Sequence, residues 1–398
     1  MRHDSTIAVT LGILLGCGPA VIGPVAPRPS LGGPGTDLES RVYLWMEDRC
    51  LADNGPPCSW SDELAPAATA LAESLVRDGS GAFESESFVR AELARAGIGH
   101  PNTMAAALFY SGDAPSDRDL ATFVSGVRWR WPVREFAVAE AGPPAATDGP
   151  SAVVVVGMER LVEMDPPPRW LPQAAAVTFG GALLTGWSNA TAFVSGPSGA
   201  VREVAVRAGA DGAFRGALPI GPEPGRYVFE LLAERGGGGP AVVYLLPIEL
   251  SATPPEPPAP PGETGGAETT EPALATEAMV SLVNAFRSEN GLAALGRSAD
   301  LDAAASSHAA DMAANGFFGH VSPTRGDLTE RLRSARIPAP RAAENLALGP
   351  SAEAAFRNLL DSPAHRANFL DPDLSLLGVS CARSGDSLVF AIVMAAGW

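Results

Sequence analysis

Lysine is absent from this 398-residue chain, so all 28 of its basic side chains are arginines. Catalysis through a lysine Schiff base and phosphate loops that depend on a lysine are therefore excluded. The formal net charge is -17, and the arginines form no clustered basic stripe. Because binding to nucleic acid depends on neutralising phosphates with clustered basic side chains, the sequence predicts no nucleic-acid partner.

Cysteine is also scarce, with 4 residues in the whole chain. Cys50 and Cys58 lie close enough in sequence to close a small loop in an oxidising compartment, which makes them a candidate disulfide. Neither a Cys-x-x-Cys pair nor a Cys/His zinc-knuckle spacing occurs, so a structural zinc site of that type is excluded. Cys381 is left alone, and we expect it to be a small buried residue in a strand.

An apolar run over residues 7–15 follows a single arginine and is too short to span a bilayer as a helix. It predicts an export signal over residues 1–16. The run ends in Leu-Leu-Gly followed by Cys17, which resembles the lipobox of bacterial lipoproteins, where cleavage before the cysteine leaves it lipidated. The alternative is a plain signal peptide, or a buried apolar segment, that happens to end in cysteine.

The resemblance to lipoproteins implies a location and a partner. Cys17 would anchor the protein through lipid in a bilayer of the cell envelope, with the remainder of the chain facing the periplasm or the exterior. Gly18 follows the cysteine in place of aspartate. By the same resemblance, that residue implies the outer membrane if the cell is Gram-negative.

Proline and glycine divide the rest of the chain. Residues 17–37 are mostly Gly, Pro and small apolar residues, which suits a tether, and residues 251–271 contain a stiff proline-rich linker. A further boundary is marked by three prolines in the region 158–168. The length suits two or three domains, and we expect three globular parts, 38–158, 159–250 and 272–398, in a chain of the α+β class.

The middle part, 159–250, consists of short β-rich runs separated by Gly and Pro turns. This pattern predicts a small β-sandwich. In one of the runs Tyr227, Phe229 and Leu231 alternate with Val228 and Glu230, as expected for a strand with one face in a core. The part resembles an immunoglobulin-like module, on the spacing of its strands alone.

The first and third parts have similar stretches of sequence. Residues 61–68 match residues 298–305, both follow an Asn-Gly pair, and two later strand-like runs also correspond. The first part is therefore interpreted as an α+β segment and a candidate internal repeat, although alanine-rich helices also match by chance. The same offset places Phe83 where His320 lies, so the first part would be a degenerate copy that has lost the site.

Two histidines of the last part are expected to be presented by well-defined helix ends. Ser298 begins a helix that ends at Gly316, and the loop after that glycine carries His320. His308 lies on the buried face of the same helix and is expected to be structural. His365 falls in the first turn of a short helix that begins with Ser-Pro, where the helix dipole favours neutral imidazole.

His320, His365 and Glu344 form a candidate metal site, because two imidazoles and a carboxylate can hold zinc with one position open. Glu344 would be the general base if the site were hydrolytic. The chain contains no His-Glu-x-x-His helix and no Gly-x-Ser-x-Gly elbow, so the common hydrolase patterns fail. The alternative is that these three residues only cap loops and a helix.

Four segments of the last part carry a resemblance to a known family: 315–323 around His320, Glu344 with the Asn-Leu-Ala that follows it, 362–370 around His365, and 377–379 with Gly378. In this order they are similar to the CAP superfamily, the cysteine-rich secretory and pathogenesis-related proteins, in its bacterial form. The resemblance implies a three-layer α-β-α sandwich for 272–398. It also implies a groove with two histidines and two acids, in which the histidines hold zinc or another divalent ion in some members.

His320, His365 and Glu344 match three of these four groove residues, but the second acid has no clear equivalent, and Asp361 is the acid near its place. We favour an envelope lipoprotein whose CAP domain binds a divalent metal or a small ligand without catalysis. One alternative is a metal-dependent hydrolase or peptidase that acts on an envelope or extracellular substrate. The other is a structural module that contacts an envelope protein.

Overall fold

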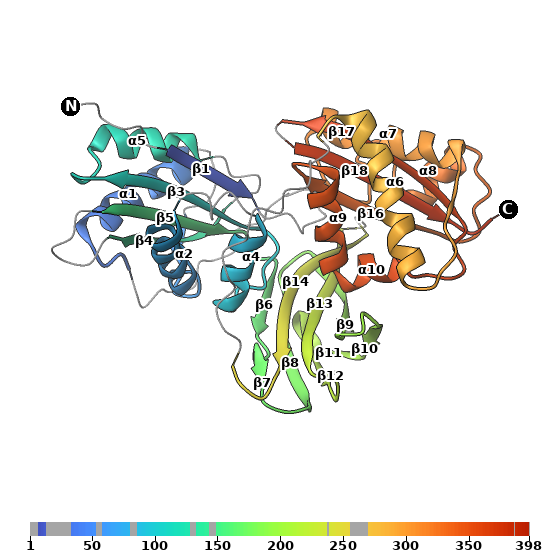
Figure 1. Ribbon diagram of the computed structural model, residues 1–398, viewed down its shortest axis with the longest axis horizontal. Helices are drawn as coiled ribbons and strands as arrows, with labels where there is room; N and C mark the ends of the chain where they lie inside the picture. The colour runs from blue at the N-terminus through green and yellow to red at the C-terminus, as the bar shows by residue number, and fades with distance from the viewer. Residues whose placement is uncertain are drawn as a thin grey trace. The chain divides into compact units, whose positions relative to one another are not determined.

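The computed structural model describes residues 7–12, 33–52, 58–79, 86–127, 133–142, 149–236, 239–254, 270–385 and 387–397. They belong to two compact units (Figure 1), one ending at Leu161 and the other holding residues 162–254 and the described residues from 270 onward. The mixed α+β class is confirmed. Cys17, most of the predicted tether and most of the proline-rich linker lie outside the described residues.

The first unit contains a mixed sheet in the order β1-β3-β5-β4-β2. Its strands are β1 (Ile7–Gly12), β2 (Ser59–Trp60), β3 (Thr103–Ser111), β4 (Glu135–Ala141) and β5 (Pro150–Met158). Its helices are α1 (Asp37–Ala52), α2 (Ala65–Asp78), α4 (Glu86–Arg95) and α5 (Asp117–Gly126). Residues 7–12 of the predicted export signal form β1, which pairs antiparallel with β3.

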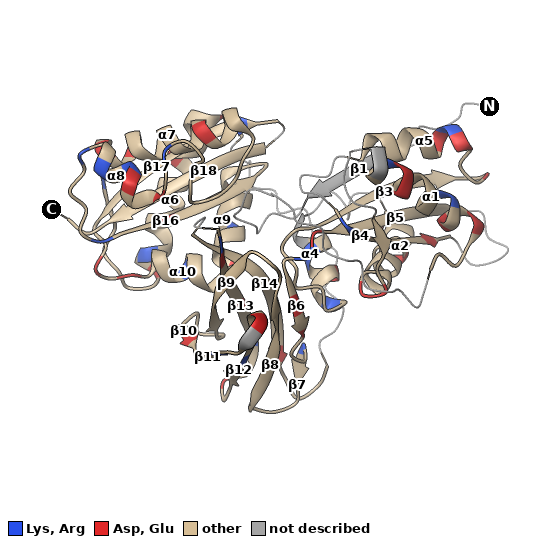
Figure 2. Cartoon of the chain, turned by 180° about the vertical axis from the view of Figure 1, so that it is seen from behind, with Lys and Arg blue, Asp and Glu red and all other residues tan. Residues whose placement is uncertain are grey.

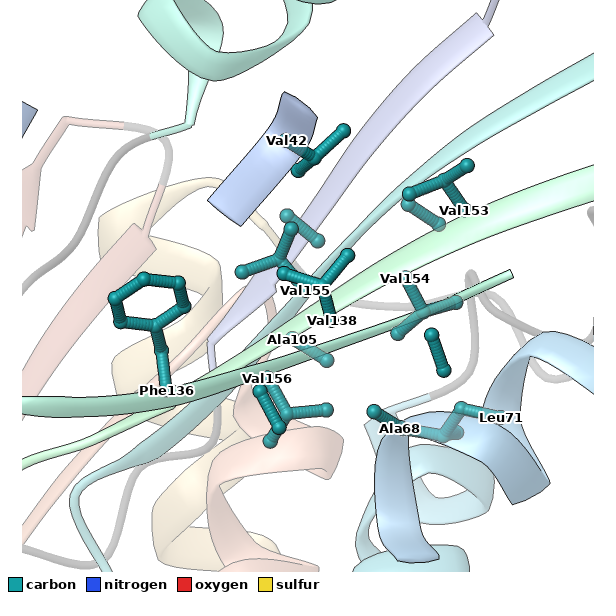
Figure 3. Close-up of a cluster of buried hydrophobic side chains, with 14 of the residues drawn as sticks. Val42, Ala68, Leu71, Ala105, Phe136, Val138, Val153, Val154, Val155 and Val156 are labelled. Carbon is teal, nitrogen blue, oxygen red and sulfur yellow. The ribbon is translucent and has the colours of Figure 1, made fainter. Parts of the chain in front are cut away.

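The core of the first unit lies on both faces of its sheet. Figure 3 shows Val42 of α1 on one side of the strands and Ala68 and Leu71 of α2 on the other. A strand covered on both faces is apolar throughout, which explains the uninterrupted valine run 153–156 in β5. A disulfide joins Cys50, at the end of α1, to Cys58.

The second unit begins with two β-sheets. Their strands are β6 (Val162–Asp165), β7 (Trp170–Leu171), β8 (Ala175–Leu183), β9 (Trp187–Ser195), β10 (Val201–Val204), β11 (Val206–Ala208), β12 (Ala213–Ile220), β13 (Gly225–Arg235) and β14 (Pro240–Leu250). One sheet has the order β10-β9-β13-β14-β7 and the other β11-β12-β8-β6. The rings of Phe179 in β8 and Phe229 in β13 lie 4.7 Å apart between the sheets. The segment is thus a β-sandwich, and its likeness to immunoglobulin modules stays a prediction.

The C-terminal part of the second unit is a sheet between helices. The strands are β15 (Gly296–Arg297), β16 (Ala342–Gly349), β17 (Leu376–Ser384) and β18 (Ser387–Ala395), in the order β15-β17-β18-β16. The helices are α6 (Pro272–Glu289), α7 (Ala299–Asn315), α8 (Leu328–Ser334), α9 (Ala352–Asp361) and α10 (Pro363–Phe369). Helices α6, α9 and α10 share a core with one face of the sheet. Because α7 packs against the other face, the predicted three-layer sandwich is confirmed.

Four strands of the N-terminal sheet have the topology of the C-terminal sheet, and β1 is an additional edge strand beside β3. In the first unit, β2 pairs in parallel with β4, β4 pairs antiparallel with β5, and β5 pairs antiparallel with β3. In the C-terminal part, β15 pairs in parallel with β17, β17 pairs antiparallel with β18, and β18 pairs antiparallel with β16. When the two sheets are aligned strand for strand, Ala105 of β3 takes the position that Glu344 has in β16. Phe83 lies outside the described residues. The topology agrees with an internal repeat, and the interpretation as a degenerate copy stays a prediction.

Charged residues are dispersed along the chain, with acidic and basic positions interspersed in each unit (Figure 2). Since the chain has no lysine, every basic residue in that view is an arginine. None of the helices in the described residues combines the length and the apolar character needed to cross a bilayer.

Candidate functional site

The edge strand β16 organises the candidate site. Consecutive residues of a strand point to opposite faces, so Glu344 and Asn345 serve different layers. Glu344 accepts hydrogen bonds on the face covered by α7 and α8, from His320 and from Arg331 of α8. The Nδ2 group of Asn345 donates to the main-chain oxygen of His365 on the other face, at 2.9 Å. One strand therefore contacts both histidine-bearing segments.

Glu344 is a buried carboxylate held by three donors. Two guanidinium nitrogens of Arg331 each lie 2.9 Å from one of its oxygens, and Nδ1 of His320 lies 2.9 Å from Oε2. Only 2% of the Glu344 side chain and 5% of the Arg331 side chain are exposed. Burial raises the pKa of Glu344, but the hydrogen bonds from His320 and Arg331 outweigh it and bring the pKa down to about 2. The group is therefore a permanent acceptor and a poor general base.

His320 lies on the loop that follows α7. That helix ends at Gly316 in the left-handed conformation, with φ at 64°, as the sequence predicted. Because the Glu344 carboxylate can only accept, the Nδ1–H of His320 is the donor of their hydrogen bond. The imidazole in its neutral form then carries its lone pair on Nε2. A histidine fixed by a carboxylate in this way is typical of metal ligands.

His308 supports the same loop from within α7. Its side chain is fully buried, and Nε2 donates to the main-chain oxygen of Gly319 at 2.9 Å. Burial lowers the pKa of His308, so the ring is held neutral. The residue fits the structural role that its position on the helix predicted.

His365 lies in the first turn of α10, where Ser362 caps the helix by accepting the N–H of His365. Burial, with a contribution from the charge of His320, lowers the pKa of His365 to about 3. Burial therefore favours the neutral imidazole that the helix start predicted. Its Nδ1 atom is buried and has no hydrogen-bond partner in the described residues. The buried Nδ1 atom of His308 also has no partner in the described residues, so this feature is not specific to His365.

Glu344 was predicted as a metal ligand, and in the structure its carboxylate is engaged by neighbouring side chains. Both oxygens of Glu344 are engaged with Arg331, so the carboxylate orients His320. Nowhere among the described ranges do three or more His, Cys, Asp or Glu side chains form a ready-made metal cluster. Imidazole nitrogen is the donor type that zinc commonly takes, and His320 and His365 each carry one.

Asp361, the predicted acidic partner, ends α9, and its carboxylate lies 3.9 Å from the guanidinium of Arg226 in β13. Arg331 was missed by the sequence reasoning. It is one of three arginines within residues 331–336, and nothing in their spacing distinguishes the buried one from the exposed Arg333 and Arg336.

Comparison with known proteins agrees with this geometry. The model of the Cysteine-rich secretory protein family, CAP, matches residues 280–395. Residues 280–395 form a CAP domain. The match covers the sheet β15-β17-β18-β16 together with His320, Glu344 and His365. The predicted resemblance is therefore confirmed for this part of the chain.

Two curated relatives, both from Bacillus subtilis strain 168, align with the CAP domain. The "Uncharacterized protein YkwD" is 33% identical over 108 residues, which are 27% of this chain and 42% of that protein. The "Uncharacterized membrane protein YlbC" is 35% identical over 109 residues, which are 26% of this chain and 31% of that protein. The chain thus spans less than half the length of either relative.

Solved structures give weaker similarity. An extracellular protein containing a SCP domain from Bacillus anthracis matches with a TM-score of 0.30 and 14% identity, covering 59% of this chain and 89% of that one. An outer surface protein from Borrelia burgdorferi matches with a TM-score of 0.30 and 17% identity, covering 31% and 94%. Similarities at this level add nothing to the assignment made from residues 280–395.

Proposed function

We propose that the CAP domain binds a divalent metal ion through His320 and His365 without catalysing a reaction. The observation that carries this proposal is the carboxylate-bound imidazole of His320 in the same domain as the buried imidazole of His365. His320 is oriented through Nδ1 by a buried carboxylate, and His365 is neutral with an orphan buried nitrogen. Zinc suits two imidazole ligands, and a bound ion would supply Lewis acidity toward a ligand oxygen.

The hydrolase alternative is less well supported by the same geometry. It needs a general base, and the residue expected for that role is Glu344. With a pKa of about 2 and both oxygens held by Arg331, Glu344 binds protons too weakly for the task. Binding without turnover therefore fits the site better than catalysis.

The proposal extends to a small ligand in this domain. A cleft of about 820 Å³ lies at α7 and α8, and its lining residues include Ser307, Thr324, Arg325, Arg331 and Arg333. Arg331 belongs both to this lining and to the ion pair with Glu344. A ligand in the cleft would thus be connected to His320 through one side chain.

Calorimetric titration of the full-length protein with Zn²⁺ tests the metal proposal. We expect one equivalent to bind, and we expect the affinity to fall at least about 100-fold in a His320→Ala, His365→Ala double variant, because both nitrogen donors are removed. His100→Gln, in the first unit, is the control and should bind as the wild type does. Failure of the wild type to bind Zn²⁺, or equal binding by the double variant, would exclude the site.

We also propose that the protein is an envelope lipoprotein anchored through Cys17. The proposal rests on the lipobox-like sequence at residues 14–17 and on the apolar run before it, and cleavage before Cys17 would remove the edge strand β1. Cys17→Ser is expected to move the protein from the membrane fraction to the soluble fraction of the producing cell, because the lipid is attached to that sulfur. Immunoblotting of the two fractions measures this, and an unchanged distribution would refute the anchor.

A further inference from the structure

The outer face of one β-sandwich sheet is covered. In β13, Tyr227, Phe229 and Leu231 point into the sandwich, so Val228 and Glu230 point outward. Val228 is nevertheless only 8% exposed and Glu230 is 0% exposed. Helix α10 of the CAP domain contacts β13 and the neighbouring strands β9 and β10. The β-sandwich and the CAP domain therefore share a buried interface at the helix that carries His365.

Glu230 holds the beginning of α10 with both of its oxygens. The hydroxyl of Ser362 donates to Oε1, and the N–H of Ala364 donates to Oε2 at 2.6 Å. Ser362 also accepts the N–H of His365 at 3.3 Å. A continuous hydrogen-bonded path thus runs from Glu230 through Ser362 to the main chain of His365.

Two further contacts bring the β-sandwich to the same region. Nε of Arg366 donates to the main-chain oxygen of Gly199 at 3.1 Å. Gly199 has φ at 79°, a left-handed conformation that favours glycine, and its main-chain oxygen faces the Arg366 guanidinium. At Gly239, just before β14, an added Cβ would lie 3.7 Å from the Cβ atom of His320. The sandwich therefore reaches both histidine-bearing segments.

We propose that Glu230 is a positioning residue of the CAP site, which fixes His365 from the neighbouring β-sandwich. A fully buried carboxylate is costly unless it is well hydrogen-bonded. Burial raises the pKa of Glu230 to about 7, although the hydrogen bonds from Ser362 and Ala364 act to lower it. Its two acceptor bonds both go to the first turn of α10. The histidine site is consequently built by two domains, and the sandwich is part of it.

Loss of Glu230 is expected to change both the surroundings of the His365 imidazole and the affinity for a metal. Without Glu230, the N–H of Ala364 and the hydroxyl of Ser362 lose their buried acceptor, and the first turn of α10 loosens. The imidazole of His365 then changes its surroundings whether or not a metal binds. The consequence for metal affinity rests on the proposed function, whereas the change at His365 does not.

The test uses the full-length protein labelled with ¹³C at histidine. The chain has 5 histidines, so the imidazole Cε1–Hε1 spectrum is simple, and His365→Gln identifies the His365 cross-peak. Glu230→Leu is expected to shift that cross-peak and to weaken Zn²⁺ binding about 10-fold, as for residues that orient metal ligands. Glu230→Gln is expected to restore both, because its amide can accept from Ala364 and donate to Ser362.

Glu234→Leu is the matched control. Glu234 lies on the same strand and accepts a hydrogen bond from Asn189 on the exposed surface, so the His365 cross-peak should stay in place. An unshifted His365 cross-peak in Glu230→Leu would overturn the proposal. If that variant does not fold, as judged by loss of the other histidine cross-peaks, Ser362→Ala breaks the same path, and an unshifted peak there would overturn it. If Zn²⁺ binds to no variant and not to the wild type, the metal proposal fails while the cross-peaks still decide the role of Glu230.

Discussion

The Arg331→Leu variant is expected to lose about 3–5 kcal/mol of unfolding free energy, because the change leaves the buried Glu344 carboxylate without its cation. Arg331 donates two hydrogen bonds to that carboxylate and a third to the main-chain oxygen of His320. The side chains of Arg331 and Glu344 are almost completely buried, so solvent screens the pair little. The same substitution would release the loop that carries His320.

Urea unfolding followed by circular dichroism measures this loss. Arg333→Leu is the matched control, since Arg333 lies two residues further along α8 and is exposed, and its effect should stay below about 0.5 kcal/mol. Adding Glu344→Leu to Arg331→Leu should recover much of the stability, because the unpaired charge is then gone. A loss below about 1 kcal/mol in Arg331→Leu would show that this ion pair does not hold the site.

Gly378→Ala is expected to destabilise the CAP domain by about 3 kcal/mol, at the upper end of the effect of overpacking. Gly378 lies in β17 on the face that α7 covers, and a Cβ atom there would lie 2.1 Å from the main-chain carbon of Leu301. The obstacle is backbone rather than the tip of a flexible side chain, so helix α7 would have to move. Glycine at this position therefore allows the helix to lie directly on the strand.

Thermal unfolding monitored by calorimetry measures the effect of Gly378→Ala. Gly296→Ala is the control in the same domain, because a Cβ atom there would meet Leu376 at 3.7 Å, which is an ordinary contact. We expect the control to unfold within about 0.5 kcal/mol of the wild type. Equal stabilities of the two variants would contradict the close packing of α7 on β17.

The local parts of the site could be predicted from the sequence. Ser298 and Gly316 bound α7, and Ser362 begins α10, because caps and left-handed glycines depend on only a few neighbouring residues. These caps placed His320 on a loop and His365 in a first helical turn. The strand alternation likewise showed that Val228 and Glu230 point out of the sandwich.

The partners of these residues could not be predicted, because they come from distant segments. Arg331 reaches Glu344 from α8, and Glu230 reaches Ser362 from another domain, 132 residues away in the sequence. A strand pattern tells which side chains leave the sandwich core and does not tell whether water or another domain covers them. Glu230 thus had the sequence signature of an exposed residue and is fully buried.

The long-range ion pair with Arg331 gives Glu344 a role that differs from the predicted one. The sequence offered it as a metal ligand or a general base, since a carboxylate between two histidines suits both. The structure instead pairs it with Arg331 and places it behind His320. The spacing of the arginines at 331, 333 and 336 carries no local signal for such a partner, so this role became visible only with the fold.

X-ray absorption at the zinc edge, measured on the full-length protein loaded with one equivalent of Zn²⁺, tests most directly whether the two histidines hold a metal. The account predicts a first shell with two imidazole nitrogens, whose ring scattering falls to one imidazole in His365→Ala. The other donors should be oxygen, since the histidines are joined by water or a ligand in that shell. A wild-type shell without imidazole, or one unchanged by His365→Ala, would contradict the proposed site.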